Sequence, residues 1–335
     1  MLPAILGLSG LALTDAERGL IRDVDPAGFI LFGRNVHDKA QLRALTDALR
    51  DSSGRDDLPI LVDQEGGRVA RLAPPEWPAF PAPWRFAELY RKAPISAIEA
   101  ARANAEAIAV MLGEAGINVD CTPVLDVRQD GAHDVVGDRA LGAEPMQVAA
   151  LGRSVLDGLE AGGVLGVLKH VPGHGRAHDD SHEKLPVVEA SAEELAMDLA
   201  PFRALAGAPV AMAAHLLYPA WDPVRPASAS PAIVAKIIRG EIGFDGLLLS
   251  DDIAMGALSG SAAARAEAVI AAGCDLALHC SGQAEDNEAI AGALGAISAA
   301  AAARLERALA RIAGKASVRV FEELAAKRDA LLAYA

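Results

Sequence analysis

The chain alternates short apolar runs with longer stretches in which apolar residues recur at helical spacing. The short runs are typical of strands buried on both faces. Eight such runs lie at Ala4–Leu8, Gly28–Phe32, Pro59–Val62, Asn118–Val124, Gly163–Leu168, Pro209–Ala214, Leu247–Ser250 and Asp275–His279. The helical patterns lie at Asp15–Arg22, Lys39–Asp51, Ser96–Ala115, Met146–Ala161, Ser191–Leu205, Pro231–Ile242, Ser261–Ala272 and Gln283–Ala313. This series of strand–helix pairs predicts an α/β fold, a single (β/α)8 TIM-like barrel, with an open doubly wound sheet as the alternative.

Local signals refine the boundaries of this barrel. The first helix is expected to be capped by Thr14 or Asp15, and the fifth begins with a capping box formed by Ser191 and Glu194. Pro-rich Ala73–Trp84 is expected to form a surface loop after the third strand. No linker divides the chain, so residues 1–335 are expected to form one catalytic barrel domain, with 317–335 as an extra C-terminal helix.

Composition and charge limit the partners and the cellular location that we expect for the protein. The sequence is 52% hydrophobic, which allows a large core, and its net charge of −14 argues against nucleic acid or an anionic membrane as partner. Three scattered cysteines give no disulfide framework. No apolar run is long enough to span a membrane, and the apolar N-terminus lacks the basic start and cleavage site of a signal peptide. We therefore expect a cytoplasmic protein, with a monomer favoured.

The densest chemistry lies in the stretch Lys169–His182, which contains four histidines, two aspartates and a lysine. It follows the fifth predicted strand, and Pro172 with its neighbouring glycines prevents a helix there. The stretch is therefore a loop at the carboxyl end of a strand, where parallel α/β proteins usually carry their chemistry. On a helix, histidines at every fourth residue would form a metal ladder; without the helix we expect no metal and no cofactor.

Polar side chains also follow the other predicted strands. They are Arg34-Asn35, Asp63-Gln-Glu-Gly-Gly-Arg-Val-Ala-Arg71, Asp126, Asp138-Arg139, His215 and Asp251-Asp252. In a barrel these strand ends meet at one mouth. We therefore expect the side chains to converge on a polar ligand of modest size.

Position alone leaves several roles open. Asp251 emerges from an apolar strand and could be a carboxylate nucleophile or an ion-pair partner inside the barrel. Asp180, two residues before His182, could fix the tautomer of that imidazole and strengthen it as a base, or could make only a local turn contact. Lys169 and His170 could donate to ligand hydroxyls, although a salt bridge would also explain the lysine.

The combination of motifs resembles glycoside hydrolase family 3, most closely its single-domain bacterial β-N-acetylhexosaminidases of peptidoglycan recycling. The motifs that carry the resemblance are Lys169-His-Val-Pro-Gly-His-Gly175, Asp180-Ser-His182, Ser250-Asp251-Asp252-Ile-Ala-Met255, Ile30-Leu-Phe-Gly-Arg-Asn35, Asp63–Arg71, Pro123-Val-Leu-Asp126, Gly137-Asp-Arg139 and Ala214-His215. They extend over almost the whole chain. Val171, where the family usually has Phe, and Ala140-Leu141, where Ser-Phe is common, depart from the pattern but only flank the polar groups.

The resemblance implies a role for each matching residue. Asp251 would be the catalytic nucleophile, with Asp252 ranked second, and His182 would be the general acid/base, assisted by Asp180. The residues that would contact the sugar are Asp63, Arg71, Arg139, Lys169 and His170. The implied reaction is hydrolysis of terminal β-linked N-acetylglucosamine from a small saccharide such as a muropeptide, with retained configuration. The alternatives are a family 3 enzyme of other sugar specificity, a metal-dependent barrel hydrolase and a non-catalytic sugar-binding barrel.

Overall fold

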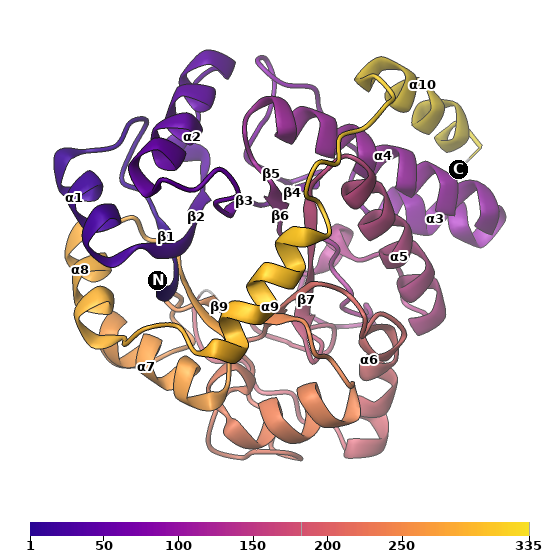
Figure 1. The fold of residues 1–335 in the computed structure, drawn as a ribbon. Helices are drawn as coiled ribbons and strands as arrows, with labels where there is room; N and C mark the ends of the chain where they lie inside the picture. The colour runs from indigo at the N-terminus through magenta and orange to yellow at the C-terminus, as the bar shows by residue number, and fades with distance from the viewer. Residues whose placement is uncertain (182, 335) are drawn as a thin grey trace.

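The protein forms a closed barrel of parallel strands surrounded by helices (Figure 1), in a computed structural model that describes residues 1–181 and 183–334. Neighbouring strands follow the order β1-β10-β9-β8-β7-β6-β3-β2 around the barrel. In the described part of the chain these strands are β1 (Leu2–Gly7), β2 (Pro26–Leu31), β3 (Ile60–Val62), β6 (Val119–Asp120), β7 (Leu165–Val171), β8 (Val210–Ala213), β9 (Leu247–Asp252) and β10 (Leu276–His279). Each overlaps one of the predicted apolar runs, so the predicted (β/α)8 barrel is confirmed.

Helices cover the outside of the barrel, close to the predicted positions. They are α1 (Asp15–Val24), α2 (Lys39–Ser53), α3 (Trp84–Lys92), α4 (Pro94–Glu114), α5 (Pro145–Ala161), α6 (Ala192–Ala204), the π-helical η4 (Ile233–Glu241), α7 (Ala262–Ala272), α8 (Ala284–Ala293), α9 (Ala299–Ala310) and α10 (Phe321–Leu332), with short 3-10 turns η1 (Gly33–Asn35), η2 (Gly137–Arg139) and η3 (Ala227–Ala229). Thr14 caps α1 and Ser191 caps α6, each in a capping box, as predicted.

Three predictions about local structure were incomplete or wrong. The single helix expected over Gln283–Ala313 is two helices, α8 and α9, because the segment between them bonds to Met1 through the Ile297 amide and Ser298 then caps a new helix. A hairpin of β4 (Gln64–Gly66) and β5 (Val69–Ala70) was not predicted. The expected surface loop after it buries Trp77 and Phe80, so it belongs partly to the core.

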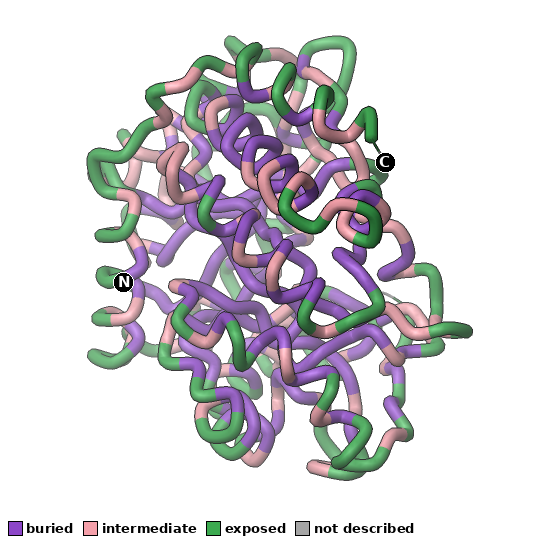
Figure 2. The backbone as a smooth tube through the Cα atoms, turned by 90° about the vertical axis from the view of Figure 1, so that its right-hand side faces the viewer, coloured by how far each residue is buried: buried purple, intermediate pink, exposed green. Residues whose placement is uncertain are grey.

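Side-chain alternation along the strands determines which side chains lie at the barrel mouth. Inward-facing apolar residues such as Leu61, Leu165, Val167, Leu247 and Leu249 fill the barrel interior, while their neighbours face the helices. In Figure 2 the buried segments run through the centre of the molecule and the exposed ones lie mainly in peripheral turns. With a period of two, the next inward positions after these residues are those of Asp63, Lys169 and Asp251. The strands therefore deliver charged side chains to the mouth directly above an apolar core.

The C-terminal helix lies outside the ring of barrel helices. Figure 1 shows α10, in yellow, beside α3 and α4. No helix in the described part of the chain is both long enough and apolar enough to cross a lipid bilayer.

Candidate active site

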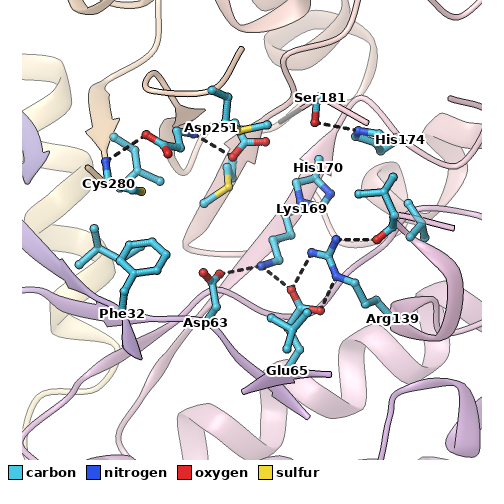
Figure 3. Close-up of a pocket in the computed structure, with 18 of the residues that line it drawn as sticks. Phe32, Asp63, Glu65, Arg139, Lys169, His170, His174, Ser181, Asp251 and Cys280 are labelled. Carbon is cyan, nitrogen blue, oxygen red and sulfur yellow. Dashed lines mark hydrogen bonds and ion pairs between the residues drawn. The ribbon is translucent and has the colours of Figure 1, made fainter. Parts of the chain in front are cut away.

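A pocket of about 750 Å³ opens at the carboxyl ends of the strands (Figure 3). Its polar lining comes from loops and strand ends far apart in the sequence. These residues are Asp63, Glu65, Arg71, Arg139, Lys169, His170, His174, Ser181, Asp251 and Asp252. Its apolar lining includes Phe32, Met212, Met255 and Leu278. A pocket with converging polar groups and a partly apolar lining fits a small polar ligand.

One side of the pocket is a network of ion pairs, which we call the ion-pair wall: Asp63, Glu65, Arg71, Arg139 and Lys169. The Lys169 ammonium lies 3.0 Å from Asp63 Oδ1 and 2.7 Å from Glu65 Oε1. Arg139 donates twice to Glu65, with both bonds at 2.8 Å, and Arg71 bonds Asp63 at 3.0 Å. Each carboxylate of this wall therefore has two cationic partners.

Electrostatics keep the ion-pair wall charged although it is buried. Burial alone would raise the pKa of Glu65, but Arg139 and Lys169 outweigh burial and hold that pKa far below its ordinary value. Burial alone would lower the pKa of Lys169, but the carboxylates of Asp63 and Glu65 outweigh burial and raise that pKa. Glu65 and Lys169 are therefore both charged at neutral pH.

The β4–β5 hairpin that carries Asp63, Glu65 and Arg71 is fixed by the buried Gln64. Its side-chain carbonyl accepts hydrogen bonds from the Arg71 and Leu72 amides, both at 3.0 Å, and its side-chain amide donates to the Leu72 carbonyl at 2.9 Å. The Gln64 backbone amide donates to Asp120 Oδ1 at 2.9 Å. Gln64 thus ties the strands of a short hairpin that would be marginal alone to the neighbouring chain.

The opposite side of the pocket, which we call the carboxylate wall, consists of Asp251 and Asp252 at the end of β9. Asp252 Oδ1 accepts hydrogen bonds from the Ala254 and Cys280 backbone amides, at 2.9 and 3.0 Å. Asp251 Oδ1 accepts one bond, from the Asp252 amide at 2.8 Å. Among the described residues, no cationic side chain forms an ion pair with Asp251.

The pKa values of the two aspartates shift in opposite directions. Burial tends to raise the pKa of Asp251, but the imidazoles of His170 and His215 outweigh it and lower that pKa below the ordinary value. Burial dominates at Asp252 and raises its pKa. His215 lies behind this wall, where its Nε2 meets the Asp252 carbonyl at 3.0 Å and its Nδ1 meets the Ser228 hydroxyl at 2.6 Å. Asp251 is therefore ionised at neutral pH, and within residues 1–181 and 183–334 it has no cationic side-chain partner.

The first part of the histidine loop is held by one buried carboxylate. Asp126 bonds His170 Nδ1 at 2.7 Å and accepts the backbone amides of His170 and His174. Burial would raise the pKa of Asp126, but His170 outweighs it and brings the pKa down to about 2. His174 Nε2 in turn lies 3.2 Å from the Ser181 hydroxyl, which brings the residue after Asp180 to the pocket lining.

The structure brings most of the predicted site residues together. Asp63, Arg71, Arg139, Lys169, His170 and Asp251 all line the pocket. Asp180 is half-buried beside Ser181, whereas His182 lies outside the described residues. Asp251 forms no ion pair with a lysine or arginine among the described residues, so that alternative role is not seen there. Lys169 does form the salt bridge that was the alternative to ligand binding.

Several polar residues of the site were given no role from the sequence. Glu65 follows Asp63 by two residues and so projects to the same side of an extended chain, which was a usable signal. Asp126 was expected at the barrel mouth and His174 lies in the predicted loop, but the sequence did not indicate that Asp126 would bond His170 or that His174 would lie beside Ser181. In the described part of the chain, no three His, Cys, Asp or Glu side chains are placed to hold a metal ion.

Comparison with known proteins identifies the family. The sequence profile described as "Glycosyl hydrolase family 3 N terminal domain" matches residues 5–314. A protein of Chromobacterium violaceum named "Beta-hexosaminidase" is 37% identical over 98% of this chain and 91% of its own. Another of that name, from Aromatoleum aromaticum, is 40% identical over 83% of this chain and 79% of its own. Among solved structures, NagZ from Neisseria gonorrhoeae in complex with N-trifluoroacetyl-D-glucosamine superimposes with a TM-score of 0.87 and 30% identity, over 99% of this chain and 97% of that one.

The profile covers most of the chain, and these relatives match it at high identity over most of their own length. The fold and the polar strand ends agree with that match. The chain therefore belongs to glycosyl hydrolase family 3.

Proposed function

We propose that this protein is a retaining exo-β-N-acetylglucosaminidase that removes terminal β-linked N-acetylglucosamine through a covalent glycosyl–aspartate intermediate. The observation that carries the proposal is the uncommitted, ionised Asp251 carboxylate facing a network of ion pairs across a pocket. Relatives named "Beta-hexosaminidase" and a NagZ structure holding an N-acetylglucosamine analogue support the sugar specificity. Carboxylate nucleophiles are the usual means by which retaining glycosidases form their intermediate.

In the first step, an oxygen of Asp251 attacks the anomeric carbon as the bond from that carbon to the leaving oxygen breaks. Asp252 is the weaker candidate, because two backbone amides already occupy its Oδ1. The Asp251 pKa lies below its ordinary value, so the nucleophile is ionised at neutral pH.

The sugar ring is proposed to be held by Asp63, Arg71, Arg139, Lys169 and His170, which line the pocket opposite Asp251. Sugar hydroxyls both donate and accept hydrogen bonds, so they need carboxylates and cations in fixed positions. The ion-pair wall provides both, and its internal ion pairs fix the geometry before the sugar binds.

The leaving oxygen must receive a proton, and we assign this role to His182 with Asp180 as its partner. His182 would then take a proton from the water that releases the sugar in the second step. The position of Ser181 in the pocket lining supports the assignment, since the two residues on either side of it form the pair. His174 is a poor alternative, because burial lowers its pKa to about 4 and leaves it neutral at pH 7.

The biological setting follows from the resemblance and from composition. We propose that residues 1–335 form one catalytic domain, that the protein acts in the cytoplasm on muropeptides during cell-wall recycling, and that it needs no cofactor. Its partner would be a small saccharide, and neither nucleic acid nor a membrane is expected at an acidic surface of net charge −14.

The decisive experiment is trapping with a 5-fluoro N-acetylglucosaminyl derivative, followed by peptide mapping to single-residue resolution. A label on Asp251 supports the proposal, and a label on Asp252 or elsewhere contradicts it. Asp251→Asn should take up no label, while wild-type protein should cleave an aryl N-acetyl-β-glucosaminide faster than the aryl glucoside. Loss of activity on treatment with a chelator would favour a metal-dependent hydrolase instead.

A further inference from the structure

We propose that α10 is a positioning element for the sugar pocket: it braces the β4–β5 hairpin through Phe80 and so sets affinity for the sugar. This inference rests on the function proposed for the pocket. Helix α10 begins at Phe321, beyond the family match at residues 5–314, yet it is connected to the ion-pair wall by a short series of contacts.

The first step in that series is the attachment of α10 to α4. The segment before α10 is anchored at Glu106, a buried carboxylate on α4 that receives hydrogen bonds from Ser317 and Arg319. Further along α10, Arg328 Nη1 donates to the Asn104 side chain at 3.2 Å, and both residues are buried. A buried carboxylate paired with an arginine fixes a segment more firmly than surface ion pairs do.

The second step is Phe80, which lies between α10 and the hairpin. The Phe321 ring meets the Phe80 ring edge to face, with centroids 6.1 Å apart, and the Arg328 guanidinium lies 5.6 Å from the Phe80 centroid. The Phe80 ring is thus held on the α10 side by two side chains. Phe80 is 6% exposed, so these contacts are made away from solvent, where aromatic and cation–π contacts are strongest.

The third step connects Phe80 to the hairpin through backbone. The Gly67 amide donates to the Phe80 carbonyl at 3.0 Å. Gly66 packs so closely on the Pro81 carbonyl that a Cβ there would collide with it, and its φ of +95° also requires glycine. The turn of the hairpin therefore rests directly on the segment that α10 supports.

The last step connects the hairpin to the ion-pair wall of the pocket. Glu65 directly precedes Gly66 and holds both Arg139 and Lys169, while Arg71 follows β5 and holds Asp63. If Phe80 loses its support, the turn can shift, and the partners in the ion-pair wall shift with it. Displacements of about 1 Å far from the reacting atoms can reduce activity by up to about 100-fold.

The test compares Phe321→Ala with Lys327→Ala, a change on the same helix that removes only an exposed ion pair to Glu99. Phe321→Leu serves as the conservative variant that keeps an apolar contact with Phe80. Hydrogen exchange of peptides covering residues 64–72 is measured for each, well below the unfolding temperature. KM and kcat on an aryl N-acetyl-β-glucosaminide and inhibition by N-acetylglucosamine are then measured.

In Phe321→Ala, exchange at residues 64–72 should accelerate by about tenfold, because the Gly67 bond opens more often. KM and the inhibition constant should rise together by about tenfold with little change in kcat. Phe321→Leu should recover most of both effects, and Lys327→Ala should match wild type. Unchanged exchange at residues 64–72 in Phe321→Ala, or an unchanged KM with a lower unfolding temperature alone, would overturn the inference. Because hydrogen exchange needs no substrate, it tests whether α10 supports the β4–β5 hairpin even if the proposed activity were absent.

Discussion

The two sides of the pocket use carboxylates in opposite ways. On the ion-pair wall, Asp63 and Glu65 each contact two cations, and Lys169 is shared between them. On the carboxylate wall, Asp251 accepts a single backbone hydrogen bond from within the described chain and has no cationic partner there. Asp251 and Asp63 are both half-buried, and the pKa of each lies below its ordinary value, so neither exposure nor ionisation distinguishes them.

The difference lies in what each carboxylate is already bound to. A carboxylate whose lone pairs are occupied by lysine and arginine is stabilised as a charge but is a poor nucleophile. Asp251 is kept ionised by more distant imidazoles, which lower its pKa without occupying its oxygens. We therefore propose that the ion-pair wall holds the sugar and that Asp251 reacts with it. Four substitutions test this division, ordered by their expected effect on turnover.

The largest effect is expected for Asp251→Ala, which removes the only uncommitted carboxylate we assign to bond formation. Turnover of an aryl N-acetyl-β-glucosaminide should fall by about 10⁴-fold or more, as for other catalytic groups that act directly. Affinity for N-acetylglucosamine should change little, because the ion-pair wall is intact. Near wild-type turnover in this variant would contradict the assignment of the nucleophile.

This assignment shows how far the sequence alone could lead. Apolar runs predicted every barrel strand, because strands buried on both faces leave a continuous signal. Alternation along β9 also favours Asp251 over Asp252 as the inward-facing residue, since Leu247 and Leu249 face the barrel interior. The site was therefore partly encoded in local periodicity.

Other features left no local signal. The bidentate bond between Glu65 and Arg139 joins residues 74 positions apart, and only the folded barrel brings them together. The β4–β5 hairpin has strands of three and two residues, too short for any periodicity to appear. The proposed roles of Asp180 and His182 stay predictions, because His182 lies outside the described residues.

The second substitution, Lys169→Met, tests the ion-pair wall. It leaves Asp63 and Glu65 with one cation fewer in a buried site, which should lower the free energy of unfolding by about 3 kcal/mol. Distortion of the wall should also reduce kcat/KM by about 100-fold. Denaturant unfolding and steady-state kinetics measure the two effects.

Arg43→Met is the matched control, because it breaks an ion pair between half-exposed Arg43 and Asp47 on α2. That change should lower the free energy of unfolding by less than about 1 kcal/mol and leave kcat/KM unchanged. Equal losses of stability in Lys169→Met and Arg43→Met would show that the wall is not an interdependent network.

The third substitution, Asp252→Asn, sharpens the contrast within the carboxylate wall. The asparagine oxygen can still accept the Ala254 and Cys280 amides, and the loss of charge on such bonds costs about 1 kcal/mol, so kcat/KM should fall by less than about tenfold. Asp251→Asn, the equivalent change one residue earlier, should be far more damaging. Comparable losses in the two variants would mean that the neighbouring carboxylates act as a pair.

The smallest effect on turnover is expected for Asp120→Asn, beneath the ion-pair wall. Burial raises the pKa of Asp120 to about 8, whereas an unfolded aspartate titrates near pH 3.9. Between these values the folded carboxyl keeps a proton that the unfolded one releases, so the stability it contributes below pH 4 is lost as pH rises toward 8. The asparagine keeps the Gln64 hydrogen bond and does not titrate, so kcat/KM at pH 7 should stay close to wild type.

The stability of Asp120→Asn relative to wild type should therefore increase with pH, by up to about 1.4 kcal/mol for each unit between pH 5 and 8. Urea unfolding of both proteins across that range measures the trend, and each protein at pH 5 serves as its own reference. A difference in stability that is the same at pH 5 and pH 8 would mean that Asp120 is ionised in the folded protein. The ion-pair wall would then rest on a third charged carboxylate, and Lys169 would have to balance it as well as Asp63 and Glu65.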